Sequence, residues 1–252
     1  EDLDEKLSGL VPEVRFIDFD GLGFNPLQVL DRDSRLAYLD VAASVRDIFS
    51  AVYPELGDLQ GDKIRTAIRQ SFIDVDPRWG QNDADLSDAI VPPFGRFLEL
   101  LRDEAASNRD QGFRNLMSRL GELDDYGFFS TTDDEQSIWE SDRPTVIRIH
   151  TTQNETLQRA FASMVFYGLY KGMFQRGTQD RITHSIIFDE AHRAARMKLI
   201  PTMAKECRKY GISLVLASQE TKDFNDSVFS AIANYLALQL NDTDAKSFVR
   251  NV

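Results

Sequence analysis

A short apolar run that ends in two adjacent carboxylates constrains this chain more than any other segment. It begins at His184, continues through Ser-Ile-Ile-Phe to Asp189 and Glu190, and is followed by Ala-His. A parallel strand that is covered on both faces needs apolar side chains throughout. The carboxyl ends of such strands open into the crevice where α/β sheets bind ligands. The segment therefore predicts a buried strand that delivers Asp189 and Glu190 to a ligand site.

The two acids have different expected roles at such a site. Mg²⁺ is held by one or two carboxylates together with phosphate oxygens, so we expect Asp189 to bind the metal. We expect Glu190 to polarise the attacking water, as in phosphoryl-transfer enzymes. This is a Walker B interpretation. Acids at this position also favour the N-terminus of a following helix through the helix dipole, and the short motif alone leaves both interpretations open.

A second strand of the same kind follows. Pro201 suits the first turn of a helix, and Gly211 suits the stop after it. The apolar run over residues 212–217 has the length of a strand and leads into Ser218 and Gln219. Parallel strands joined by a helix end on the same edge of their sheet. We therefore expect Asp189 and Gln219 to lie at one sheet edge near a shared crevice, with Gln219 near the γ-phosphate or the attacking water.

Arg208 stands at the end of the helix expected between these two strands. A guanidinium there can point out of the subunit, and an arginine supplied to a neighbour's nucleotide raises the rate by several orders of magnitude. We expect it at the rim of the site. The alternative is a surface arginine that pairs with Glu206 or another nearby acid, which contributes little.

The segments IIFDEAH and ECRKYGISLVLASQ resemble the HerA/FtsK superfamily of ring-forming, DNA-translocating ATPases. That superfamily includes the conjugative coupling proteins and the secretion ATPases. The resemblance spans residues 14–251 and is strongest over 145–219. It implies an α/β, RecA-like (P-loop NTPase) parallel sheet flanked by helices. It also implies ATP and Mg²⁺ as cofactors, a hexameric homo-oligomer with ATP between subunits, DNA bound through pore loops, and a nuclease partner in DNA end processing.

The same resemblance assigns roles to the residues at the strand ends. Asp189 and Glu190 match the Walker B pair, Gln219 matches the sensor of the γ-phosphate, and Arg208 matches the arginine finger. Three further strands are implied, over residues 14–19, 145–150 and 235–240.

The sequence contains no G-x-x-x-x-G-K-[ST] motif. A phosphate cradle needs Gly-rich backbone, a Lys and a Ser or Thr together, and the pair Lys171–Gly172 lies in a helix-like run. We therefore expect a fragment that lacks the first βα unit and is inactive by itself. The expected organisation is a partial RecA-like ATPase domain over 1–252, a helical insertion over 34–123, and a core with Walker B, arginine finger and sensor over 145–252.

The expected insertion follows from helical periodicity after the first strand. Ser34 is a favourable N-cap, and apolar residues then recur at helical spacing. The pattern predicts helices over 34–52, 59–72, 92–101 and 112–123, with a polar loop over 74–88 and apolar stripes that form a core. Asn154 is the expected cap of another long helix. In the acidic connector over 124–142, we expect Phe128, Phe129 and Trp139 to be anchors rather than a stacking site for bases.

Composition restricts the possible classes. The net charge is −12, whereas a broad DNA-binding surface should be basic, so DNA contact should be confined to loops. No apolar run approaches the roughly 18 residues of a membrane span, and we expect a cytoplasmic protein. The single cysteine, Cys207, excludes an internal disulfide, and the three histidines are too dispersed to suggest a zinc cluster.

Two other classes of function remain open at this point. One is a scaffold or assembly module with a vestigial nucleotide site, which the missing phosphate motif favours. The other is a DEAH-type helicase with two lobes, which the literal Asp-Glu-Ala-His sequence suggests. The biological setting also stays open between DNA end processing, conjugation and phage defence.

Overall fold

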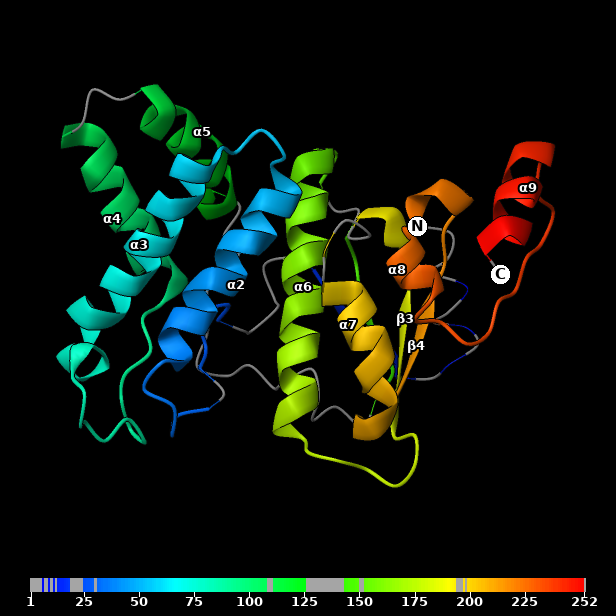
Figure 1. Cartoon of the computed structure of the whole chain (residues 1–252), viewed down its shortest axis with the longest axis horizontal. Helices are drawn as coiled ribbons and strands as arrows, with labels where there is room; N and C mark the ends of the chain where they lie inside the picture. The colour runs from blue at the N-terminus through cyan, green and yellow to red at the C-terminus, as the bar shows by residue number, and fades with distance from the viewer. Residues whose placement is uncertain are drawn as a thin grey trace. The chain divides into compact units, whose positions relative to one another are not determined.

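The computed structural model describes residues 6, 9, 11, 13–18, 25–29, 31–107, 111–125, 143–149, 152–193, 197 and 199–251. The chain divides into two compact units, residues 1–161 and 162–252. Each unit combines helices with one two-stranded parallel sheet in its described part (Figure 1). The expected Phe128, Phe129 and Trp139 anchors lie outside the described residues.

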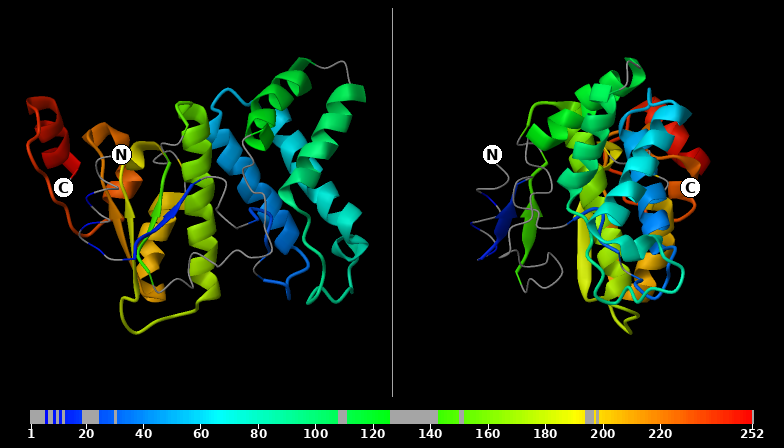
Figure 2. Two further views of the ribbon diagram at one scale, coloured as in Figure 1. Left: turned by 180° about the vertical axis from the view of Figure 1, so that it is seen from behind. Right: turned by 90° about the vertical axis from the view of Figure 1, so that its left-hand side faces the viewer.

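The sheet of the first unit joins two strands that are far apart in the sequence. Strand β1 (Arg15–Ile17) pairs in parallel with β2 (Thr145–Ile147), and the two run side by side in Figure 2. Just beyond the strand ends, the guanidinium of Arg148 donates to the carboxylate of Asp18, with 2.9 Å between Nε and Oδ1. The expected strands at 14–19 and 145–150 are therefore present, in shorter form.

Four α-helices lie between these two strands in the described chain. They are α2 (Ala37–Val52), α3 (Asp58–Val75), α4 (Phe94–Ser107) and α5 (Gln111–Asp125), with the short 3-10 helix η2 (Pro77–Gly80) after α3. Each predicted helix is present, with bounds within three residues of the prediction except that α4 continues to Ser107 rather than ending at 101. Ser34 is not the N-cap of α2. Its hydroxyl accepts from the N–H of Leu36, and the helix begins one residue after Leu36.

Aromatic rings form the centre of the helical layer. Phe49 of α2 packs against Phe94 and Phe97 of α4, with ring centroids 6.3 and 6.2 Å apart. Phe72 of α3 meets Trp79 edge-on at 5.2 Å. All five side chains are buried, and aromatic pairs in such geometries add roughly 0.5–1.5 kcal/mol beyond their area burial. The apolar stripes are core, as expected, except that Leu36 is 50% exposed.

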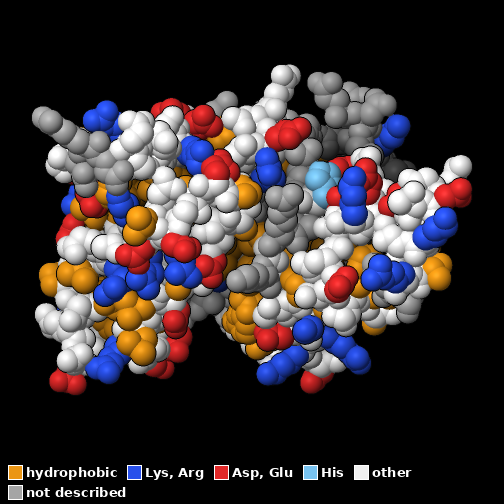
Figure 3. All heavy atoms as spheres, turned by 45° about the horizontal axis from the view of Figure 1, so that its top comes forward, with side chains coloured by type: hydrophobic (Ala, Val, Ile, Leu, Met, Phe, Trp, Pro, Cys, Tyr) orange, Lys and Arg blue, Asp and Glu red, His pale blue; other side chains and the backbone are white. Residues whose placement is uncertain are grey.

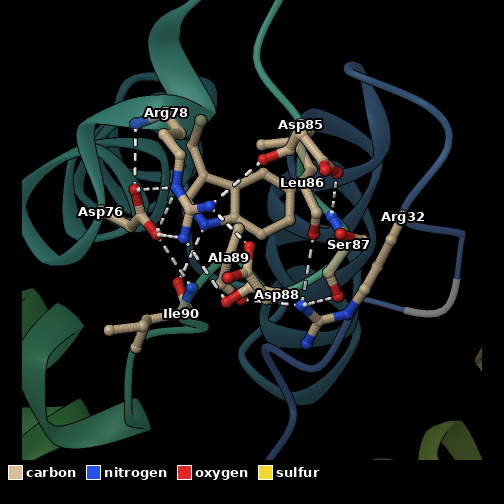
Figure 4. A network of polar contacts seen from close by, with 10 residues as sticks. Arg32, Asp76, Arg78, Asp85, Leu86, Ser87, Asp88, Ala89 and Ile90 are labelled. Carbon is tan, nitrogen blue, oxygen red and sulfur yellow. Dashed lines mark hydrogen bonds and ion pairs between the residues drawn. The ribbon is translucent and has the colours of Figure 1, made fainter.

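The loop that follows η2 is ordered by arginines (Figure 4). Arg78 donates to the carboxylates of Asp76 and Asp88, at 2.8 and 2.6 Å. Arg32 reaches the loop from outside it and donates to the carbonyl oxygen of Ala89 at 2.7 Å. The Arg78 hydrogen bond, together with the N–H of Ile90, lowers the pKa of Asp76 well below its usual range. The polar stretch over 74–88 that was predicted as a loop thus contains the end of α3 and η2, and the part beyond η2 is a loop held by charge-assisted hydrogen bonds.

A long helix leads into the second unit. Helix α6 (Glu155–Gln175) is capped by Asn154, whose side-chain oxygen accepts from the N–H of Thr156 at 3.0 Å, as the sequence predicts. Phe166 of α6 stacks on Phe188 at 5.9 Å. The Lys171–Gly172 pair lies inside this helix.

In the second unit, the two paired strands are connected in the sequence through a helix. Strand β3 (His184–Phe188) is followed by the 3-10 helix η4 (Ala191–Arg193), α7 (Leu199–Glu206) and the 3-10 helix η5 (Cys207–Tyr210). Strand β4 (Ile212–Leu216) then pairs with β3 in parallel, with Phe188 opposite Leu216. Figures 1 and 2 show α6 and α7 on the same face of this sheet. The short helices η6 (Thr221–Asp223) and α8 (Asp226–Phe229) follow, and α9 (Asp242–Asn251) ends the described chain.

Two expectations about the sheet are wrong. The described strands form two separate pairs rather than one continuous sheet. Strand β3 is also not covered on both faces. Side chains alternate between the two faces of a strand, and those on one face of β3 are exposed. Phe188 packs under α6, whereas Ile187 and its partner Val215 are 72% and 46% exposed.

The expected strand at 235–240 is also absent from the described structure. Tyr235 is instead held locally. Its ring packs against Phe229 of α8 and Phe248 of α9, with centroids 6.0 and 5.9 Å apart. Leu236 and Leu238, which follow it, are 89% and 82% exposed. Within the described part of the chain, no helix combines the length and apolarity that crossing a membrane requires.

Candidate functional site

The carboxyl ends of β3 and β4 are held together beyond the last paired residues. The N–H of Ala217 donates to the carbonyl oxygen of Phe188 at 2.9 Å, and the N–H of Ala191 donates to that of Ala217 at 2.8 Å. These two bonds lie on either side of Asp189 and Glu190. The turn after β3 and the turn after β4 are therefore adjacent, which brings the polar residues of both strand ends to one edge.

Glu190 has a strained backbone at this edge. Its φ angle is 55°, in the left-handed region, which only one other non-glycine residue among those described adopts. Such a conformation costs on the order of 1–3 kcal/mol and persists where the surroundings enforce it, commonly at functional sites. Its N–H donates to Oδ1 of the preceding Asp189 at 3.0 Å. The turn therefore presents two consecutive carboxylates at the end of β3, and this hydrogen bond fixes the carboxylate of Asp189 relative to the backbone of Glu190.

The carboxylate of Glu190 is held from two sides. Nε2 of Gln219 donates to Oε1 of Glu190 over 2.8 Å. On the other side, Nδ1 of His192 lies 3.1 Å from Oε2. The prediction that the ends of the two strands, with Asp189 and Gln219, lie at one sheet edge is confirmed. The contact with His192 was not predicted, although a residue two positions after an acid in a tight turn is a natural candidate.

Asp189 is exposed at the same edge. Among the described residues, no three His, Cys, Asp or Glu side chains converge as a metal cage would require. A single exposed carboxylate suits Mg²⁺, which keeps several waters and takes its other ligands from substrate phosphates. The donor set therefore fits a magnesium ion that arrives with a nucleotide, and Asp189 is the residue that would hold it.

Arg208 is not brought to this edge. It lies in η5, directly before β4, and its carbonyl oxygen accepts from the N–H of Gly211 at 3.0 Å. Gln219 follows the opposite end of the same strand. Five strand residues at about 3.3 Å each put roughly 16 Å between these two ends. Arg208 is therefore separated from Gln219 of its own subunit by the length of β4, and its side chain is exposed.

Burial affects the ionisation of two further residues that the sequence analysis named, Cys207 and Lys171. Cys207 is buried, and burial raises the pKa of its thiol, which is the opposite of activation. Burial also lowers the pKa of Lys171 to about 7. Its ammonium lies 5.0 Å from the centre of the Tyr167 ring in the same helix.

The fold is a helix-rich α/β arrangement with small parallel sheets in the described part of the chain. No family model matches the sequence, and no curated protein matches it. Among solved structures, the chain is similar to VirB4 of Thermoanaerobacter pseudethanolicus, with a TM-score of 0.72 and 18% sequence identity. The match covers 100% of this chain and 70% of the VirB4 chain. The chain therefore shares the fold of VirB4, and the fold that the sequence resemblance implied is confirmed in part, since the sheet is present in the described residues only as two-stranded pieces.

Proposed function

We propose that this chain is part of an ATP-driven DNA-translocating motor of the HerA type, which hydrolyses ATP between the subunits of a ring. The observation that carries this proposal is the contact between Gln219 and the strained Glu190, beside Asp189, on a fold shared with VirB4. Three side-chain types that hydrolysis needs meet at one sheet edge. A carboxylate suited to a metal, a proton acceptor and an amide donor lie at this edge, brought together from two strand ends.

The chemistry follows from the types of group. The carboxylate of Glu190 would accept the proton of the attacking water, because an ionised carboxylate has about four acceptor sites and, among the described residues, two contacts to it are seen. The amide of Gln219 would orient Glu190 and detect the terminal phosphate by exchanging its hydrogen bond. A Mg²⁺ ion on Asp189 would neutralise charge on the phosphates. Positioning and electrostatics of this kind supply most of the catalysis in phosphoryl transfer.

The position of Arg208 supports a site that is shared between subunits. The guanidinium is exposed but stands at the strand end opposite to Gln219, so it cannot complete its own subunit's site. An arginine finger acts on a neighbour's nucleotide in many such enzymes. Assembly as a ring, with six subunits as the resemblance implies, would place Arg208 of one subunit at the next site.

The charge distribution supports DNA contact through loops rather than through a broad surface. The net charge is −12. Figure 3 shows acidic and basic side chains interspersed over most of the face in view. Ring motors need basic groups only where loops enter the pore. DNA end processing, with a nuclease partner, and phage defence are the settings that we favour.

ATP hydrolysis by the full-length protein, measured with and without long double-stranded DNA, tests this function. We expect Mg²⁺-dependent turnover that DNA stimulates, and ATP-dependent displacement of a third strand from a triplex on the same DNA. Turnover that DNA leaves unchanged, with no displacement, would refute translocation. Absence of both nucleotide binding and turnover would favour the scaffold function, which the lack of a G-x-x-x-x-G-K-[ST] motif suggests.

A further inference from the structure

The loop that carries Gln219 is fastened at a second point. After β4, Ser218 donates from its hydroxyl to the carboxylate of Asp223, so the turn closes on itself. Two residues beyond Gln219, Thr221 begins η6. The orientation of Gln219 toward Glu190 therefore depends on where this short segment is held.

Asp244 of α9 holds Thr221. One carboxylate oxygen, Oδ1, accepts from both the N–H and the hydroxyl of Thr221, at 3.2 and 2.8 Å. The other, Oδ2, accepts from the side-chain amide of Asn241 at 2.6 Å. The N–H of Asp244 in turn donates to Oδ1 of Asn241 at 2.9 Å. Both carboxylate oxygens are thus engaged, one in the helix start and one in the loop.

This carboxylate is ionised in the folded protein. The two hydrogen bonds from Thr221 are the main cause that lowers the pKa of Asp244, and Lys222 adds to the effect. Hydrogen bonds to an ionised acceptor are roughly twice as strong as those between neutral groups. A helix start needs only local acceptors such as Asn241. A contact with a loop 23 residues away is therefore more than capping requires.

We infer that Asp244 is a positioning residue, which orients Gln219 against Glu190 by clamping Thr221. The inference rests on the proposed function, because it concerns the same hydrolytic edge. The position of α9, the helix in red in Figure 1, then controls the orientation of the Gln219 amide. A displacement of α9 would release Thr221 and let Gln219 turn away from Glu190.

Hydrogen–deuterium exchange of the whole protein, resolved by peptide, tests the clamp without any assay of activity. We expect Asp244→Ala and Thr221→Val both to accelerate exchange in the peptide that contains residues 218–224. Thr221→Val leaves the Asn241–Asp244 contacts in place, so it separates loss of the clamp from loss of the helix start. Asp242→Asn is the matched control, since Asp242 is an acid in the same helical turn and should leave that peptide unchanged. Unchanged exchange in both test variants would overturn the inference.

The second readout measures kcat and KM for ATP separately in the full-length protein. A misplaced Gln219 acts on the transition state, so Asp244→Ala should lower kcat on the order of 10- to 100-fold with KM nearly constant. Thr221→Ser, which keeps the hydroxyl, should retain the activity that Thr221→Val loses. Faster loop exchange with unchanged kcat would refute the positioning role. Absence of turnover in the unsubstituted protein would contradict the proposed function, whereas the exchange rates would still decide the clamp.

Discussion

The amide of Gln219 donates to the carboxylate of Glu190 over 2.8 Å, and this contact joins the ends of two parallel strands. Glu190 occupies a left-handed backbone conformation, which a non-glycine residue adopts at a cost. The contact with Gln219 and the one with His192 together fix the carboxylate that this turn presents. The proposed hydrolysis should therefore depend on both strand ends, and several predictions concern the residues that build or complete them.

The role of Arg208 is tested by its removal and by mixing subunits. Arg208→Ala in the full-length ring should lower ATP turnover on the order of 10³-fold, the scale of a lost arginine finger. Lys209→Ala, at the adjacent exposed position of η5, should change turnover little.

Mixed rings separate action in trans from a local effect. Subunits with Arg208→Ala, combined with subunits that carry Glu190→Gln, should regain part of the activity. Interfaces that pair an intact Glu190 with an intact Arg208 reappear in such rings. If mixed rings form without recovery, and Arg208→Ala alone hydrolyses ATP normally, Arg208 has no catalytic role.

Gly211 before β4 should tolerate no side chain. Its φ angle is +69°, and a Cβ atom there would come within 2.6 Å of the carbonyl oxygen of Arg181. We expect Gly211→Ala to reduce the free energy of unfolding by roughly 2 kcal/mol or more, from backbone strain and overpacking together. Gly177→Ala is the matched control, because Gly177 has a φ of +68° and open space around it. Urea denaturation should show a clearly smaller loss for Gly177→Ala; equal losses would contradict the steric explanation.

The lowered pKa of Lys171 leads us to expect that the free energy of unfolding depends on pH. Burial lowers its pKa to about 7, below the value of roughly 10.4 in an unfolded chain. Between these values the unfolded chain binds more protons, so the cost of burying Lys171 decreases as pH rises from 7 toward 10. Lys171→Met should therefore increase the free energy of unfolding by about 2 kcal/mol or more at pH 6.5, and by much less at pH 9.5. Lys205→Met, at an exposed position of α7, should show no such difference between the two pH values.

The sequence was informative where a pattern is local. The apolar run before Asp189 and the one before Gln219 each determine a strand by themselves, and parallel pairing then requires their ends to meet. The shared sheet edge of Asp189 and Gln219 follows from those two facts, whereas the hydrogen bond between Gln219 and Glu190 is seen only in the structure. The helices α2 to α5 were similarly predictable, because the periodicity that places Phe49 and Phe97 on buried faces is visible in the sequence.

Other features depend on what surrounds a segment. Tyr235 begins a run with the composition of a strand, but its ring lies between Phe229 and Phe248, which no periodicity reveals. The exposure of Ile187 depends on whether a layer covers that face. The end of β4 at which Arg208 lies could have been derived from chain direction, because a residue before a strand cannot reach the edge after it. The contact of Asp244 with Thr221 joins two polar segments, whose side chains carry no pairing signal.

Substitution of Glu190 decides whether this sheet edge hydrolyses ATP. Glutamine keeps the shape of the side chain but cannot accept the proton of the attacking water. ATP binding and turnover of full-length Glu190→Gln should be measured beside Glu220→Gln, which alters a nearby acid that pairs with Lys222. We expect Glu190→Gln to bind ATP nearly normally while turnover falls below detection, and Glu220→Gln to retain both. Normal turnover by Glu190→Gln, or loss of ATP binding with unchanged turnover per bound nucleotide, would show that hydrolysis occurs elsewhere or by other groups.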